Sequence, residues 1–272
     1  MSPRPSSARP PAHHAHRSAH STSWERVSGW YKSHLKHDDF LQRDVVIPGT
    51  LELIADTDGS TSHLDIACGE GTFAEAFQQA FPRREYVGAD AAPTLIQAAQ
   101  RKRLRNATFV VDDARRLATL PRDLRFGSAS CILAIQNIDL PQQVFLRAAQ
   151  VLLPGAPLVL VMNHPCFRQP RQSGWGWDEE RKIQYRRIDR YLGAYEMPII
   201  AHPGKDPALA TPSFHHSVSD FVSMLTKAGF MVDAYEEWTS PAVSDSGPRA
   251  KAENVARREI PLFLAIRARL LK

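Results

Sequence analysis

The stretch Asp65-Ile66-Ala67-Cys68-Gly69-Glu70-Gly71-Thr72-Phe73 decides how this chain folds. A short apolar run, residues 62–68, leads into its glycines, and phenylalanine and alanine recur at helical spacing over residues 72–81. Glycine allows a tight turn and a close approach of the backbone to a ligand, and a following helix presents free N–H groups and the positive end of its dipole. The stretch therefore predicts a strand, a ligand-binding glycine turn and a helix.

Strands and helices continue to alternate after the glycine turn. We expect strands at residues 85–89, 107–111, 128–135 and 157–162, and helices at residues 93–101 and 141–152. Such alternation implies a parallel sheet joined by right-handed crossovers. The nearly continuous apolar runs in the third and fourth of these strands fit burial on both faces. The pattern predicts an α/β fold with a doubly wound, mostly parallel sheet.

The alternation breaks over residues 163–213, which are rich in Pro, Trp, Tyr and Arg and are interpreted as a lid insertion after the fifth strand. The spacing leaves its shape open, because residues 185–192 fit a helix whereas residues 183–187 alternate like a strand of a hairpin. Regularity then returns, with a helix expected at residues 217–228, closed by Gly229, strands at 230–238 and 261–270, and a polar loop at 240–254.

Composition and charge narrow the class of protein. The 272 residues are 43% hydrophobic and 23% charged, as in soluble globular proteins. No apolar run approaches the roughly eighteen residues of a membrane span. Three cysteines form neither a disulfide framework nor a CxxC metal pair, which suits a reducing compartment. A cytoplasmic enzyme without a metal and without a membrane contact is the expectation.

The net charge of +5 is unevenly spread. Residues 1–24 hold three arginines and no acid, so 5 − 3 = +2 remains for the rest. A nearly neutral body disfavours a nucleic-acid-binding protein. Residues 1–23 are rich in Pro, Ser and His and are expected to be a disordered tail, with a transit peptide as the alternative. A single domain is expected over residues 24–272.

The glycine turn also fits a second class of site. Gly69, Gly71 and Ala74 satisfy the G-x-G-x-x-G/A fingerprint of nicotinamide enzymes, with Asp90 as the acid on the ribose. One such match is weak evidence. Asp65 argues against it, because a dinucleotide site favours a small apolar residue four positions before the first glycine.

From about residue 24 to the C-terminus, the chain resembles the class I S-adenosylmethionine-dependent methyltransferases, in particular the branch with a D-x-A-C-G-x-G first motif. Four segments carry the resemblance in the family's order, namely residues 65–71, Asp90, Asp113-Ala114, and Leu152-Leu153-Pro154-Gly155. The resemblance implies a Rossmann-like, seven-stranded sheet and an enzyme whose cofactor is S-adenosylmethionine.

The resemblance also implies a role for each motif residue. Asp65 would receive the ammonium group of the cofactor and Asp90 both ribose hydroxyls. Asp113 would accept the adenine amino group, with Asp112 as the alternative, unless both are solvated turn acids. The expected cofactor-binding residues are Asp65, Ala67, Cys68, Gly69, Glu70, Gly71, Asp90, Ala91, Asp113, Ala114, Ile135 and Gln136.

Polar residues after the expected fourth strand lie at the carboxyl edge, where open α/β sheets bind ligands. The resemblance implies that Ile135 and Gln136 line the methionine end, while Asn137 or Asp139 faces the methyl acceptor. Asp139 has a competing role as a helix N-cap, because Pro141 stands as if at the first position of the next helix.

Two histidines are candidate catalytic residues. His164, in the segment after the fifth strand, has a pKa suited to removing a proton from the acceptor. His215 matches a histidine near the lid of many small-molecule methyltransferases, although the residues after it differ from the family pattern. A structural histidine fits both positions equally well, and methyl transfer needs no base when positioning suffices.

Aromatic and basic residues interleave within residues 163–213, where Trp177 and Tyr185 are the candidate acceptor-binding residues. The same pattern fits base stacking with phosphate contacts, or a packed lid with a solvated outer face. Trp30 and Tyr31 either close over the cofactor or belong to the core. A small-molecule acceptor is expected. The alternatives are an RNA or protein methyltransferase, a non-catalytic cofactor-binding regulator and a nicotinamide oxidoreductase.

Overall fold

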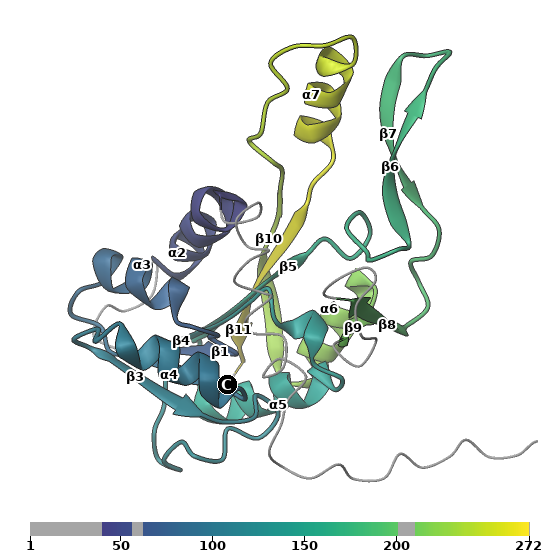
Figure 1. Ribbon diagram of the computed structural model, residues 1–272. Helices are drawn as coiled ribbons and strands as arrows, with labels where there is room; N and C mark the ends of the chain where they lie inside the picture. The colour runs from purple at the N-terminus through teal and green to yellow at the C-terminus, as the bar shows by residue number, and fades with distance from the viewer. Residues whose placement is uncertain (1–39, 56–61, 201–209, 272) are drawn as a thin grey trace, which may run out of the picture.

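The computed structural model describes residues 40–55, 62–200 and 210–271 (Figure 1). The expected tail, Trp30 and Tyr31 lie outside the described residues. The central sheet contains β1 (His63–Ile66), β2 (Tyr86–Asp90), β3 (Ala107–Val111), β4 (Ser128–Ile132), β5 (Pro157–Asn163), β10 (Phe230–Trp238) and β11 (Phe263–Leu270). These seven strands are ordered β10-β11-β5-β4-β1-β2-β3. Strand β11 runs antiparallel to the other six strands of this sheet, which are parallel to one another. The predicted doubly wound, mostly parallel seven-stranded fold is therefore confirmed.

Helices cover both faces of the sheet. The covering helices are α2 (Ile47–Ala55), α3 (Thr72–Ala80), α4 (Pro93–Arg101), α5 (Pro141–Val151) and α6 (Val218–Lys227), with the short turns η1 (Gln42–Val46) and η2 (Ile135–Asn137), whereas α7 (Ala250–Glu259) lies apart from the central sheet (Figure 1). Side chains of η1, α2, α3 and α4 pack on one face and those of α5 and α6 on the other. None of the helices in the described ranges combines the length and apolar character that crossing a bilayer demands.

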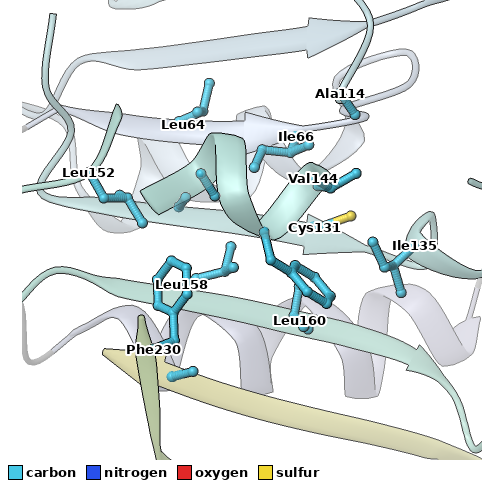
Figure 2. Close-up of a cluster of buried hydrophobic side chains, with 14 of the residues drawn as sticks. Leu64, Ile66, Ala114, Cys131, Ile135, Val144, Leu152, Leu158, Leu160 and Phe230 are labelled. Carbon is cyan, nitrogen blue, oxygen red and sulfur yellow. The ribbon is translucent and has the colours of Figure 1, made fainter. Parts of the chain in front are cut away.

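Strand β5 shows how the sequence pattern produces two cores. Leu158, Leu160 and Met162 point into the cluster beneath α5 and α6, part of which Figure 2 shows, and Val159 and Val161 point into the cluster beneath α2 and α3. All five are fully buried. Because successive strand residues face opposite sides, only a continuous apolar run fills both clusters, as the sequence predicted for this strand.

The ends of α6 follow the expected helix signals, whereas α7 corrects a prediction. Ser217 and Asp220 form a capping box at the start of α6, and Gly229 follows its end with φ of 90°. The expected polar loop at residues 240–254 is wrong over its last five residues, because α7 begins at Ala250. Only Ala256 of α7 is buried, so the sequence of this solvated helix lacks the apolar stripe that predicts helices.

The insertion after β5 forms two hairpins. Strands β6 (Ser173–Asp178) and β7 (Ile183–Ile188) pair antiparallel, as do β8 (Tyr195–Ile200) and β9 (Ala210–His215). The hairpin reading of residues 183–187 is therefore confirmed over the helical one. In Figure 1, the β6–β7 hairpin and α7 extend together away from the central sheet. Strand β9 instead contacts η2 beside the sheet.

Candidate active site

A cavity of about 390 Å³ opens at the carboxyl ends of β1, β2, β3 and β4. Its walls come from the loops after these strands, with additions from η1 and β9. Nine of the twelve predicted cofactor-binding residues line it, namely Asp65, Ala67, Cys68, Gly69, Glu70, Asp90, Ala91, Asp113 and Ala114. The sequence motifs, which are up to 49 positions apart in the chain, thus meet at one site.

The glycine turn between β1 and α3 is a left-handed backbone segment fastened to β2. Ala67, Gly69 and Gly71 have φ of 60°, 57° and 73°. The positive φ of Gly69 favours glycine at this position, whereas lack of space does not, because an added Cβ would meet nothing within 4 Å. The Cys68 N–H donates to the Ala89 carbonyl oxygen at 3.0 Å, and this hydrogen bond holds the turn against the end of β2. Gly71 does not line the cavity but precedes the first residue of α3.

Asp90 fixes this turn against the start of α4. Its Oδ2 accepts the Gly69 N–H at 2.9 Å, and its Oδ1 accepts the Ala92 N–H at 2.9 Å. The same carboxylate lines the cavity. It is placed both to shape the turn and to accept hydrogen bonds from a ligand.

Asp65 is almost completely buried at the end of β1, with 2% of its surface exposed. Burial raises its pKa to about 7, hydrogen bonds from Tyr86 and Ser130 work in the opposite direction, and the charge of Asp90 adds to the increase. Ser130 donates to its Oδ1 at 2.8 Å, and Tyr86 donates to its Oδ2. A buried carboxylate at a cavity wall favours a cationic group in that cavity.

The two acids after β3 have different partners. Asp112 accepts hydrogen bonds from the backbone N–H groups of Ala118 and Thr119, at 3.1 and 2.7 Å, and holds the following turn. Asp113 binds the guanidinium of Arg115 through both oxygens, at 2.9 and 2.6 Å. Burial alone would raise the pKa of Asp113, but the Arg115 hydrogen bonds outweigh it and the pKa is lowered. Both acids line the cavity.

Arg115 also connects the loops after β3 and β4, because its Nη1 donates to Asp139 at 2.7 Å. Asp139 therefore binds an arginine in place of the helix-capping role weighed from the sequence, and α5 has no side-chain cap. Asn137 and Asp139 both line the cavity, as expected.

The loop after β4 begins earlier than the sequence pattern indicated. Strand β4 ends at Ile132, and Leu133 and Ala134 line the cavity. Ile135 is 1% exposed and packs in the core, and neither Ile135 nor Gln136 lines the cavity. A hydrophobic run does not show at which residue its strand ends, so the predicted lining is displaced by about two residues.

His164 and His215 lie outside the cavity lining. The Nδ1 atom of His164 accepts the N–H groups of Cys166 and Phe167 at 3.1 and 3.3 Å, and its Nε2 donates to Glu237 at 2.8 Å. The Nε2 atom of His215 donates to the Tyr191 carbonyl at 2.6 Å. These contacts favour the structural role that the sequence left open for both histidines.

Trp177 and Tyr185 lie on the β6–β7 hairpin, and neither lines the cavity. The Arg249 guanidinium of α7 sits 4.6 Å from the Trp177 ring centre. Tyr185 is 44% exposed. Among the described residues of the insertion and the strand that ends it, Pro212 and Phe214 of β9 line the cavity.

The seven-stranded, mostly parallel sheet and the glycine turn are those expected of the family that the sequence resembles, and the family comparison agrees. Residues 64–155 match the family model described as methyltransferase domain. This segment is similar to methyltransferase domains. It contains the glycine turn, Asp90, Asp113 and the loop after β4, and therefore most of the cavity lining.

The chain is also similar to individual known methyltransferases. A demethylmenaquinone methyltransferase of Deinococcus radiodurans is 32% identical over 105 residues, which span 38% of this chain and 43% of that relative. The chain thus spans less than half the length of this curated relative. The solved structure of an S-adenosylmethionine-dependent methyltransferase from Mesorhizobium loti has a TM-score of 0.63 at 24% identity, covering 81% of this chain and 96% of that chain.

The glycopeptide N-methyltransferase MtfA, solved with S-adenosylmethionine, has a TM-score of 0.51 at 16% identity and covers 78% of this chain and 87% of that chain. The solved neighbours confirm the fold, and the match of residues 64–155 to the methyltransferase domain model agrees with the enzyme class that the sequence predicted.

The sequence analysis missed several residues that line the cavity. Gln42 of η1, Leu133, Pro212 and Phe214 all line the cavity. Phe214 lies one residue beyond the lid as delimited from the sequence, and its position beside η2 depends on the pairing of β8 with β9. No motif marks Gln42, whose position depends on how η1 packs.

Proposed function

We propose that the whole chain is an S-adenosylmethionine-dependent methyltransferase whose acceptor is a small, apolar aromatic molecule with an acidic hydroxyl or an electron-rich ring carbon. The observation that carries the acceptor class is an apolar part of the cavity lining, called the apolar wall below. It consists of Leu133, Ala134, Ile138, Pro212 and Phe214. Apolar side chains of this kind favour an apolar acceptor.

The titratable groups of the cavity support the same class. Among the described residues, the lining includes no histidine, lysine or tyrosine, and its one basic side chain, Arg115, is paired with Asp113 and Asp139. The described part of the lining thus offers carboxylates but no imidazole, amine or phenol as a base. We infer an acceptor whose hydroxyl is acidic enough to lose its proton to water, as that of a phenol or a quinol is. The Deinococcus radiodurans relative is named for a quinone, which agrees with this class.

The charge of the cavity disfavours the RNA alternative. Six carboxylates line it, from Asp65, Glu70, Asp90, Asp112, Asp113 and Asp139, against the single Arg115. A polyanionic acceptor would be repelled, whereas a sulfonium cation with an ammonium group would be attracted.

In the mechanism that we propose, the chain contributes binding and orientation. Bound S-adenosylmethionine would supply an electrophilic methyl group. Asp65 would hold the ammonium end and Asp90 the ribose, while Arg115 fixes the loops after β3 and β4 to each other. Pro212 and Phe214 would exclude water from the acceptor side. Positioning of this kind accelerates an in-line displacement without a general base.

A labelled-methyl assay tests this function. The protein would be incubated with S-adenosylmethionine carrying a labelled methyl group and with substituted phenols and naphthoquinols, a pool of RNA, or a pool of peptides. Label in the phenols or quinols alone is the expected result. Label in RNA or peptide alone would overturn the acceptor class, and cofactor binding without any transfer would favour a regulator.

The apolar wall gives a prediction for Phe214. Phe214→Ala is expected to lower kcat/KM for the labelled acceptor at least about tenfold, because an aromatic contact contributes about 1 to 3 kcal/mol. Tyr185→Ala removes an equally large side chain from the exposed hairpin and is the matched control, with little expected change. The opposite ranking in steady-state kinetics would show that the hairpin binds the acceptor, as the sequence alone suggested.

The hydrogen bonds of His164 give a second prediction. His164→Gln is expected to change kcat less than about tenfold and to leave the pH profile in place, because both ring nitrogens are occupied by Cys166, Phe167 and Glu237. The measurement is the pH dependence of kcat from pH 6 to 9. A fall beyond about a hundredfold with a displaced profile would make His164 a general base after all.

A further inference from the structure

A row of buried polar side chains lies within the sheet and ends at Asp65. Its members, called the polar chain below, are Arg84, Ser128, His63, Ser130, Asp65 and Tyr86. Each of these residues is at most 3% exposed. Strand register brings them together, because His63 lies opposite Tyr86 and Ser128, and Asp65 lies opposite Ser130.

The hydrogen bonds of the polar chain have one direction. Arg84 can only donate, so its Nη2 donates to Ser128 Oγ at 2.8 Å, and Ser128 gives its own proton to His63 Nδ1 at 2.8 Å. At the other end, Ser130 donates to Asp65 Oδ1 at 2.8 Å. His63 must then donate from Nε2 to Ser130 Oγ, at 3.0 Å. The aligned donors run from a cation to a carboxylate.

Aromatic rings enclose the polar chain. Phe77 stacks on the His63 ring with centroids 4.6 Å apart, and the Arg84 guanidinium lies 5.4 Å from the Phe77 ring and 5.3 Å from the Phe81 ring. Burial, aided by the charge of Arg84, keeps the pKa of His63 well below its usual value. His63 is therefore neutral and keeps the single tautomer that the chain requires.

Burying six polar side chains in a sheet of apolar strands costs free energy that their mutual hydrogen bonds have to offset. We therefore expect a function at Asp65, where the polar chain reaches the cavity. Asp65 is the only member of the polar chain that lines the described cavity. We propose that Tyr86 and Ser130 are positioning residues that hold Asp65 as the carboxylate receiving the cofactor's ammonium group, and that His63, Ser128 and Arg84 orient the Ser130 hydroxyl for this purpose. The inference rests on the proposed function, because it takes S-adenosylmethionine as the ligand.

Tyr86 completes the arrangement from β2. It donates to Asp65 Oδ2 while Ser130 donates to Oδ1, so both oxygens are oriented by side chains that do not line the described cavity. The other charged group that acts on Asp65 is Asp90, whose charge raises the pKa of Asp65. The thiols of Cys68 and Cys131 lie nearby with raised pKa values and are uncharged at neutral pH. The two donors are therefore what favours the ionised form of Asp65.

The experiment compares two ligands by calorimetry on the full chain between pH 5.5 and 7.5. S-Adenosylhomocysteine carries the ammonium group, and 5′-methylthioadenosine has the adenosine and sulfur without it. For the unaltered chain, affinity for S-adenosylhomocysteine should rise with pH as Asp65 ionises, and affinity for methylthioadenosine should stay level. Tyr86→Phe and Ser130→Ala should each weaken S-adenosylhomocysteine binding about tenfold at pH 7 and move the midpoint to higher pH. Methylthioadenosine binding should not change.

Phe77→Leu is the matched control, because it alters packing against His63 and leaves the hydrogen bonds of Asp65 intact. It should lower the melting temperature without moving the pH midpoint. The inference is overturned if Tyr86→Phe and Ser130→Ala weaken both ligands equally, or if neither variant moves the midpoint. Either variant suffices if the other fails to fold. If the unaltered chain binds neither ligand, the proposed function is contradicted. If the unaltered chain binds and the variants have the same affinity and pH midpoint, only this inference is overturned.

Discussion

Replacing Asp65 with asparagine is expected to abolish cofactor binding and, at the same time, to stabilise the protein above pH 7. The loss of binding follows from the removal of the carboxylate that would pair with the ammonium group, and S-adenosylhomocysteine affinity should fall about a hundredfold or more. Asparagine keeps the size of the side chain and an oxygen that can accept the Tyr86 hydrogen bond, so the fold should be retained.

The gain in stability follows from the raised pKa of Asp65. In the unfolded chain its carboxyl ionises near 3.8, whereas in the folded protein burial raises the pKa to about 7. As pH rises between these values, the unfolded state loses its proton first, so the free energy of unfolding falls. A shift of this size corresponds to about 4 kcal/mol by pH 7, which an uncharged asparagine would not lose.

Thermal unfolding at pH 5 and pH 8, combined with calorimetric titration, measures both effects of Asp65→Asn. Asp233→Asn is the control, because the hydrogen bonds and charges of Arg267 and Arg269 lower the pKa of Asp233 against the effect of burial. It should destabilise the protein at pH 8 and leave cofactor affinity unchanged. An Asp65→Asn protein that binds S-adenosylhomocysteine normally, or that is less stable at pH 8, would contradict this account of Asp65.

Asp90→Ala is expected to have the second largest effect on cofactor binding. The carboxylate would accept the ribose hydroxyls, an interaction worth roughly 2 to 4 kcal/mol, so affinity should fall about thirtyfold or more. The structure adds a second reason, because Asp90 also accepts the N–H groups of Gly69 and Ala92, each at 2.9 Å. Its removal also frees the glycine turn that forms one wall of the cavity.

Asp90→Asn separates the two contributions. Asparagine retains one oxygen acceptor but cannot accept hydrogen bonds through both atoms, so its affinity should lie between those of the unaltered chain and Asp90→Ala. The measurement is titration with S-adenosylhomocysteine, with circular dichroism as the check on folding. Unchanged affinity in a natively folded Asp90→Ala protein would remove Asp90 from the cofactor site.

Local sequence signals predicted the parts of the site that directly follow a strand. The glycine turn, Asp90, and Asp113 with Ala114 follow their strands directly, and a parallel sheet brings the carboxyl ends of its strands to one edge. A motif read against the strand before it therefore locates a lining residue to within one or two positions.

Other parts depend on register and packing, which leave no mark on a single sequence. Phe214 reaches the cavity because β9 pairs with β8 and contacts η2. His63 and Ser130 meet because β1 lies beside β4 in a particular register. For Trp177 and Tyr185, the aromatic composition predicted acceptor binding. Both residues lie on a hairpin that extends away from the central sheet (Figure 1), and neither lines the cavity. A composition pattern shows that side chains are suited to binding, and only their placement shows whether they bind.

The central claim is that the cavity at the carboxyl ends of β1 to β4 binds S-adenosylmethionine. Calorimetric titration of the full chain with S-adenosylhomocysteine and, separately, with NAD tests it most directly, because Asp65 at the glycine turn suits an ammonium group and not a dinucleotide. The account predicts saturable binding of one S-adenosylhomocysteine per chain and no measurable heat with NAD. Comparable affinity for NAD, or no response to S-adenosylhomocysteine, would contradict it.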